Sequence, residues 1–311
     1  ILALSQPVLG VTLQAQDNHL AIAGIAAESD LPSAVIGQRL LGIAQEGEPV
    51  IAVDARTLIE EPDMIGNADW LRDFYVQQDR LFQALSSGLV SVTVQNGAVP
   101  TSLTARVRGG RPMSDLPVKF WTQLGVGCVG LIIGFWLVCL RTRDLAAWMV
   151  LLTGVGLAMA SGAAGLYSTR ELALGYGVFR TASQVNSSGT LLFGIGILTL
   201  FLIYPRRIVP RIVLPLPALV IGSTMLFIQI ADWPRHVGLL QDGVAIIMLL
   251  LLGAIACQLV VNRRDPAARA MLGWLGLSVT LGAGGFVVTA ILPTLMGRDV
   301  LVQQSTAFLF F

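Results

Sequence analysis

The chain has 311 residues; 54% of them are hydrophobic, 13% are charged, and the mean hydropathy is +0.73. Soluble globular domains carry about 25% charged residues, so this composition excludes an ordinary soluble domain and indicates several membrane-spanning segments. The net charge of +1 averages two unlike parts, because residues 1–118 hold thirteen acidic and seven basic residues whereas residues 119–311 hold six and thirteen. All three cysteines fall in apolar runs, which excludes a disulfide framework in the polar part.

The polar part, residues 1–118, alternates between short strand-like runs and helical ones. Apolar residues recur at helical spacing in 69–85, which predicts a helix. The runs 89–97 and 102–109 alternate apolar and polar residues around a turn-forming segment, which predicts a closing hairpin. The other strand-like runs are residues 9–14, 20–25 and 49–53, with a short helix and turn expected within 28–44. We therefore expect a small α+β domain.

The first strand-like run lies in "PVLGVTL" (7–13), and the turn region contains "LPSAVIGQRLLGI" (31–43). These stretches resemble the loop and strand that open the peptide groove of PDZ domains, and the turn that follows them. The resemblance implies that backbone N–H groups near Leu9, Gly10 and Val11 hold a ligand carboxylate while the peptide adds as a strand. Gly37-Gln38 replaces the Gly-Asp pair of the family, so a domain with this fold but without a peptide ligand remains the alternative.

Seven apolar runs after the polar domain predict membrane helices, which need roughly 20 residues each. They are residues 120–140, 145–167, 188–204, 212–230, 243–261, 271–293 and an incomplete run, 300–311. We expect residues 119–311 to form an all-α transmembrane sensor bundle of about seven helices, the last one truncated. Both ends of the sequence are expected to be cut from a longer chain.

The arginines of the connecting loops predict the orientation of this bundle. Eight arginines lie in the first, third and fifth loops, and four lie in the second, fourth and sixth. Cytoplasmic loops collect basic residues, so this alternation places residues 1–118 outside the cytoplasm. We therefore expect a multi-pass protein of a bacterial inner (cytoplasmic) membrane whose polar domain is extracytoplasmic.

The second loop, residues 169–184, is long for a connection between spans and is predicted to lie on the outer side. It contains Tyr176 and Phe179, and Asn186 follows shortly after it. These three residues are candidates for a ligand pocket covered by the loop. A segment that only touches lipid headgroups is the alternative.

Catalytic and metal-binding motifs are largely missing from the sequence. The two histidines are too far apart in sequence to form a local metal motif, and no HExxH motif occurs. The stretch "MASGAAG" (159–165) is similar to the serine-bearing helix start of rhomboid proteases, but His236 falls in a loop, so we expect Ser161 to be a packing residue. No charged residue lies near the middle of a span, which disfavours an ion-coupled transporter. We predict no catalytic residue, metal or cofactor within these 311 residues.

The fifth loop reads "RRDPAARAMLGWL" (263–275) and the third helix ends in "LFLIYPRRIVPR" (200–211). Both are similar to segments of bacterial sensor histidine kinases of the ComP type, which carry an external PDZ-like domain before their membrane bundle. The matching positions of the fifth loop are Arg263, Arg264, Asp265, Pro266, Arg269 and Trp274. An acidic N-cap followed by proline suits a helix start, so a helix is expected to begin at Asp265-Pro266.

The resemblance implies the input region of a two-component sensor kinase. The signal is expected to be a peptide or a small hydrophobic molecule, the chain a homodimer in the lipid bilayer, and the partner a response regulator; nucleic acid is not expected. ATP and Mg²⁺ belong to the kinase domain that such proteins also contain. A receptor with another output domain, a transporter and a membrane scaffold remain the alternatives.

Overall fold

The computed structural model describes residues 2–16, 19–62, 65, 67–97, 99–231 and 233–292. The chain divides into two compact units. Unit 1 comprises Ile1–Pro62, Asp69–Trp121 and Leu166–Ala182, and unit 2 holds the remaining segments. Unit 1 thus contains most of the predicted polar domain and, in addition, residues 166–182, which connect two apolar runs.

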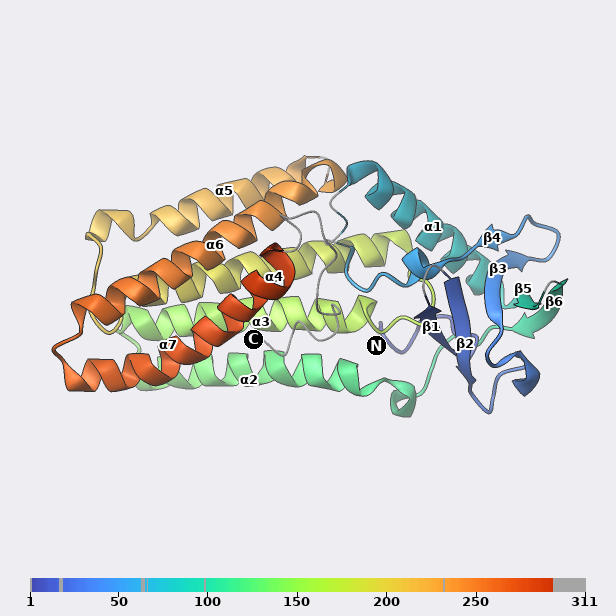
Figure 1. The fold of residues 1–311 in the computed structure, drawn as a ribbon, viewed down its shortest axis with the longest axis horizontal. Coiled ribbons are helices and arrows are strands. Elements are labelled where there is room, and N and C mark those ends of the chain that lie inside the picture. The colour runs from blue at the N-terminus through green and yellow to red at the C-terminus, as the bar shows by residue number, and fades with distance from the viewer. Residues whose placement is uncertain are drawn as a thin grey trace. The chain divides into compact units, whose positions relative to one another are not determined.

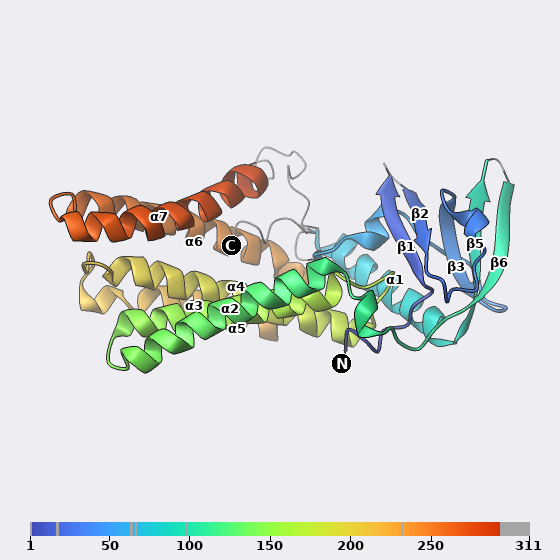
Figure 2. The same cartoon turned by 90° about the horizontal axis from the view of Figure 1, so that it is seen from below.

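Unit 1 is built on an antiparallel sheet with the strand order β1-β2-β3-β5-β6, in which β4 also pairs with β3. The strands are β1 (Val11–Gln16), β2 (His19–Ile25), β3 (Arg39–Gln45), β4 (Ile51–Ala52), β5 (Leu89–Asn96) and β6 (Val99–Arg106). Figure 1 colours them from blue to green, and Figure 2 shows β1, β2, β3, β5 and β6 side by side. The predicted closing hairpin is confirmed, since β5 pairs with β6 from Leu89↔Arg106 to Asn96↔Val99.

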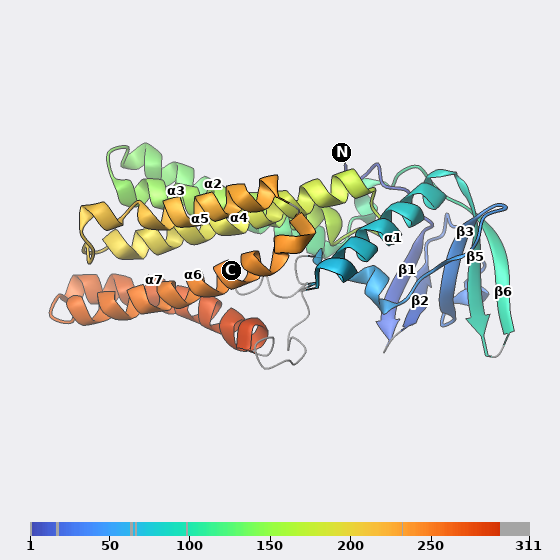
Figure 3. The ribbon, with the colours of Figure 1, turned by 90° about the horizontal axis from the view of Figure 1, so that it is seen from above.

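The core of unit 1 lies between this sheet and helix α1 (Ala68–Ser86). Figure 3 shows α1 crossing one face of the sheet. Leu81 and Leu85 of α1 are buried against strand residues such as Ile22 and Val92, as the helical spacing of the sequence predicts. The described residues of unit 1 also form the short 3₁₀ helices η1 (Ser33–Val35), η2 (Ala55–Leu58) and η4 (Met113–Asp115). The prediction of an α+β domain is confirmed.

The helical region contains six helices, within the described residues, that are long and apolar enough to cross a membrane. Five of them correspond to α2 (Val118–Leu140), α3 (Leu145–Tyr167), α4 (Tyr176–Ile203), α6 (Trp233–Val261) and α7 (Pro266–Phe286), and the sixth span, Arg211–Ile228, covers η5 and most of α5 (Leu216–Ile230). The short η5 (Arg211–Val213) precedes α5, and the π-helical η6 (Val287–Ile291) follows α7. The seventh predicted run, 300–311, lies outside the described residues. These spans indicate a multi-pass membrane protein.

Helix α4 differs most from its prediction, because it begins at Tyr176 rather than at Ser188. Its first turns contain the polar residues Arg180, Gln184 and Asn186, so they do not belong to the apolar run from which the helix is predicted. The residues up to Ala182 belong to unit 1, whose own packing explains how this polar stretch is helical.

Glycines allow α2, α3 and α4 to approach one another closely within unit 2. A Cβ at Gly130 would lie 3.0 Å from the Leu157 side chain, and one at Gly134 would lie 2.6 Å from the backbone of Leu151. Gly156 of α3 and Gly189 of α4 face each other's backbone in the same way. Small residues at such crossings permit close helix packing in a membrane, and Gly130 and Gly134 serve this packing between α2 and α3.

Candidate functional site

The loop before β1 forms a backbone site for a negatively charged group. Gly10 has a φ of +76°, a conformation that favours glycine, and it turns successive N–H groups toward one point. Leu9 N–H donates to Glu171 Oε1 at 2.7 Å and Gly10 N–H donates to Glu171 Oε2 at 3.0 Å. Val11 N–H also bonds to this carboxylate. A carboxylate of the chain itself therefore occupies the position that the sequence predicts for a ligand carboxylate.

The other side of this loop is held by separate hydrogen bonds. Ser29 Oγ donates to the Leu9 carbonyl at 2.7 Å, and Ala26 N–H donates to the Gly10 carbonyl at 2.7 Å. Val8 pairs with Arg108 in an isolated bridge, with N···O distances of 3.0 and 2.9 Å. Because the carbonyls are already bonded, the N–H groups of residues 9–11 stay directed at the carboxylate. We call these three residues the carboxylate nest.

Burial raises the pKa of the Glu171 carboxyl group to about 7, although hydrogen bonds from Leu9, Gly10 and Val11 and the positive charge of Arg111 oppose this effect. Burial likewise lowers the pKa of Arg111, and Glu171 and Asp115 oppose that change. Arg111 Nε donates to the Ala3 carbonyl at 3.1 Å. The carboxyl group of Glu171 is thus placed to change its charge near neutral pH.

Arg170, the residue before Glu171, is buried in unit 1 with several acceptors. Its guanidinium donates to the Tyr167 carbonyl at 2.7 Å, the Thr57 carbonyl at 3.2 Å, the Ile59 carbonyl at 2.6 Å and Gln78 Oε1 at 3.2 Å. It also lies 4.7 Å from the centre of the Phe179 ring. Burial lowers the pKa of Arg170 to about 10, so it stays charged at neutral pH.

Residues 172–176 continue along α1. Leu172 and Ala173 are buried in the same hydrophobic cluster as Leu81 and Leu85. A Cβ at Gly175 would lie 3.1 Å from the Phe82 ring, and Tyr176 N–H donates to Asp79 Oδ1 at 3.0 Å. The chain between α3 and α4 is therefore part of the core of unit 1. The sequence predicted a loop that covers a pocket or touches lipid headgroups, and did not predict this packing.

The predicted ligand-binding residues lie in three places. Leu9, Gly10 and Val11 come together as the carboxylate nest. Tyr176 and Phe179 lie against Tyr75, with ring centres 5.8 and 5.6 Å away, and Phe179 is fully buried. Asn186 belongs to unit 2, where its Nδ2 donates to the Ala160 carbonyl at 2.9 Å.

Sequence reasoning missed Arg170 and Glu171, which make the most polar contacts in this region. Their signal is weak but visible, since they form an adjacent pair of opposite charges directly before the apolar residues 172–174. Ser161, in contrast, behaves as a packing residue: it is fully buried and its Oγ donates to the Leu157 carbonyl at 2.7 Å.

The motif of the fifth loop lies at the start of α7. Asp265 is the N-cap, and its Oδ1 accepts from Ala267 N–H at 3.0 Å and from Ala268 N–H at 3.1 Å, with Pro266 in the first turn. The predicted helix start is confirmed. The other motif residues, Arg263, Arg264, Arg269 and Trp274, are exposed.

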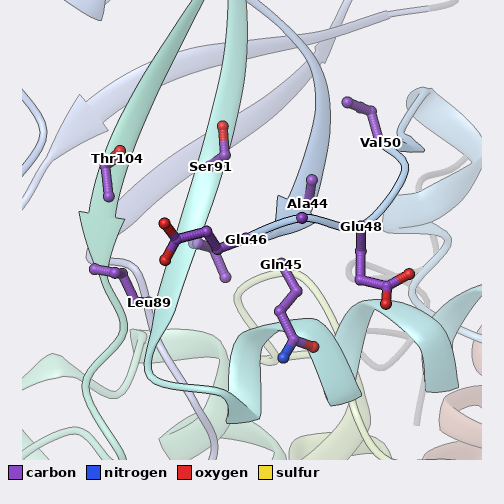
Figure 4. A pocket seen from close by; sticks show the side chains of 10 residues that line it. Ala44, Gln45, Glu46, Glu48, Val50, Leu89, Ser91 and Thr104 are labelled. Atoms are coloured by element: carbon purple, nitrogen blue, oxygen red, sulfur yellow. The ribbon is translucent and has the colours of Figure 1, made fainter.

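A hollow at the β3–β4 turn is lined by residues 44–48, Val50, residues 89–91 and Thr104. Figure 4 shows the carboxylates of Glu46 and Glu48 pointing in different directions there. No group of three or more potential metal ligands occurs among the residues that the structure describes. The nest around Glu171 is therefore the more developed polar site of unit 1.

No protein-family model matches the chain. No curated protein and no solved structure shows significant similarity to it.

Proposed function

We propose that the chain is the sensory input region of a membrane-bound sensor histidine kinase that detects an extracytoplasmic signal. The observation that carries the proposal is the place of residues 166–182, which join α3 to α4 in sequence and belong to unit 1. Arg170, Glu171 and Leu172 fasten this connection into the unit's core and nest. Unit 1 and two membrane helices therefore share one continuous, tightly bonded stretch of chain.

This arrangement suits a receptor for a physical reason. A signal that alters unit 1 near the nest must also act on residues joined covalently to α3 and α4. A ligand shifts a two-state equilibrium by binding one state better than the other. Here the two states would differ in the contacts that residues 166–182 make within unit 1. Six membrane-length helices supply the bundle on which such a shift would act.

Three further parts of the proposal concern unit 1. We assign it to the PDZ-like class, supported by the element order and by a loop that binds a carboxylate through backbone N–H groups just before β1. We place it outside the cytoplasm of a bacterial inner membrane, supported by the alternation of arginines in the connecting loops. We expect its signal to be a peptide or a small hydrophobic molecule bound beside β1, the edge strand next to the nest.

The output is proposed from the motif at the start of α7, whose residues resemble those of ComP-type kinases. Arg263, Arg264 and Arg269 are exposed, which suits a loop on the cytoplasmic side. The kinase would bind ATP and Mg²⁺, act as a homodimer and phosphorylate a response regulator. ATP and Mg²⁺ would be held by the kinase domain that proteins of this type carry.

The test is autophosphorylation of the full-length protein in membrane vesicles with radiolabelled ATP. A label that is stable in alkali and labile in acid marks phosphohistidine and supports the proposal. Arg170→Ala should change the labelling rate several-fold, because it loosens the α3–α4 connection, whereas Arg80→Ala, at an exposed position of α1, should leave it unchanged. Absence of phosphohistidine under every condition would overturn the kinase assignment, and solute flux in its place would favour a transporter.

A further inference from the structure

The connections that follow α4 and α6 are bonded to each other within unit 2, although 52 residues separate Gln258 from its partner Arg206 in the sequence. Gln258 Nε2 donates to the Phe201 carbonyl and to the Arg206 carbonyl, both at 2.7 Å. Asn262, just after α6, donates from Nδ2 to Gln258 Oε1 at 2.8 Å. Both amide side chains are buried, so the connection after α4 is fixed to the end of α6 by groups that water does not reach.

The start of α7 joins the same region. Tyr204 Oη, in the connection after α4, donates to Met271 Sδ at 3.6 Å. Leu272 of α7 is buried in one hydrophobic cluster with Phe201 of α4 and Ile255 of α6. The ends of α4 and α6 and the first turns of α7 therefore converge.

This convergence gathers positive charge from two separate loops. Residues 204–215 and 262–270 contain a single acidic residue, Asp265, whose Oδ1 accepts two N–H groups of α7. All the arginines of these two segments are exposed, and none of them takes part in the ion pairs found among the described residues. We call them the arginine cluster: Arg206, Arg207, Arg211, Arg263, Arg264 and Arg269.

The arginine cluster lies where apolar helices give way to polar connections. Beside it, the large apolar side chains of Ile212, Val260 and Trp274 are 82%, 66% and 81% exposed. Exposed apolar residues of membrane helices contact lipid, and tryptophan is enriched at the level of the headgroups. Arginines at this level meet lipid phosphates, which the planar guanidinium group binds through paired hydrogen bonds.

We propose that the arginine cluster binds one anionic phospholipid, whose head group bridges the α4–α5 connection and the α6–α7 connection. A head group with two phosphates, as in cardiolipin, suits the site, because each phosphate can meet arginines of a different connection. Basic sites between membrane helices bind head groups of this kind. The apolar surface beside the arginines favours a lipid over a soluble phosphate. The inference requires only that the helices lie in a bilayer, so it does not depend on a kinase output.

Native mass spectrometry of the full chain in a neutral detergent, titrated with cardiolipin, tests the site. The wild type should retain one cardiolipin in preference to phosphatidylcholine. Replacing either pair, Arg206→Gln with Arg207→Gln or Arg263→Gln with Arg264→Gln, should weaken binding roughly thirtyfold, because each interfacial arginine strengthens it about fivefold. Arg141→Gln with Arg143→Gln is the matched control, since it removes two exposed arginines from the α2–α3 connection. This control should keep the wild-type affinity.

Gln258→Leu separates the geometry of the site from its charge. The variant keeps every arginine but loses the bonds to the Phe201 and Arg206 carbonyls, so the two connections are no longer fixed to each other. Its affinity for cardiolipin should fall, whereas an effect of total charge alone predicts no change. If Gln258→Leu does not fold, the exposed arginine pairs decide.

Three results would overturn the proposal. Equal losses from the arginine cluster and from the α2–α3 control would mean that charge acts without a defined site. Two bound cardiolipins, of which each pair variant loses one, would mean two separate sites in place of one that bridges the connections. Displacement of cardiolipin by an equal concentration of inorganic pyrophosphate would identify a site for soluble phosphates. Absence of phosphohistidine would refute the kinase output and leave the lipid site standing.

Discussion

Two connections between apolar helices contain the same kinds of residue and use them differently. The α3–α4 connection holds Arg170 and Glu171, and the α6–α7 connection holds Arg263, Arg264 and Asp265. In the first, the arginine is buried with oxygen acceptors and the carboxylate is bound by backbone N–H groups that lie some 160 residues away in the sequence. In the second, the arginines are exposed and the carboxylate caps its own helix.

The difference shows that a cluster of charged residues in a loop between two apolar helices has no fixed role. Exposed arginines act together, because the total positive charge of a loop determines its orientation in the membrane. Replacing one of them changes stability little. A buried arginine with several acceptors acts individually, because its removal leaves buried polar atoms without partners. Which role applies depends on whether a folded unit takes up the connection, and this can be tested by substituting matched residues in the two connections.

Arg170→Ala should have the largest effect. It removes the donor to the Thr57, Ile59 and Tyr167 carbonyls, so unit 1 should lose about 3–5 kcal/mol of stability. Hydrogen exchange of the buried β3 and β5 amides in the intact protein measures this loss. Arg264→Ala is the control in the exposed connection and should change stability by less than about 0.5 kcal/mol. Equal effects of the two substitutions would abolish the distinction between the connections.

Leu172→Ala should come next. Leu172 is 1% exposed in the core cluster of unit 1, and truncating a buried leucine typically costs about 2–4 kcal/mol. The same exchange measurement on β3 and β5 reports it. Val178→Ala, at an exposed position two residues into α4, should change stability by less than about 0.5 kcal/mol. A small effect of Leu172→Ala would mean that the connection is only loosely attached to the core.

Most elements of this fold could be predicted from local pattern. Helix α3 matches its prediction at both ends, and α1 begins and ends within one residue of its predicted range. Hydropathy and periodicity detect these elements because burial in lipid or against a sheet acts on every residue of the run. Asp265-Pro266 was predictable for a similar reason, since a helix cap involves only neighbouring residues.

Of the carboxylate site, the N–H donors could be predicted from the sequence, but the carboxylate that they bind could not. The loop at Leu9 and Gly10 resembles a known pattern, which indicated that its N–H groups bind a carboxylate. The carboxylate itself comes from Glu171, and nothing near residue 171 in the sequence encodes a contact with residue 9. The start of α4 was placed at Ser188 for the same reason, because its first turns are held by the packing of unit 1 and not by an apolar run.

The pH dependence of stability should report on the Glu171 carboxyl group of the α3–α4 connection. Glu171 has a pKa of about 7 in the folded state and 4.5 in water, so the folded state binds more protons between these values. The free energy of unfolding should therefore be highest below about pH 4.5 as far as Glu171 is concerned, and should fall by roughly 2–3 kcal/mol as the pH rises to 7. Denaturant-dependent exchange at a series of pH values measures this contribution. Glu171→Gln should remove it, and a slope that persists in this variant would assign it to another group.

Asp265→Ala should have the smallest effect, and a local one. The Asp265 side chain accepts from Ala267 and Ala268 N–H at an exposed helix start, and loss of such a cap costs about 1 kcal/mol. Exchange should accelerate about fivefold at the first amides of α7, while the amides of unit 1 keep their wild-type rates. Asp265→Asn retains a capping oxygen and should restore protection, which a role for the charge alone would not allow. An effect of Asp265→Ala that reached unit 1 would mean that this connection also takes part in a wider network, and that exposure does not distinguish the two.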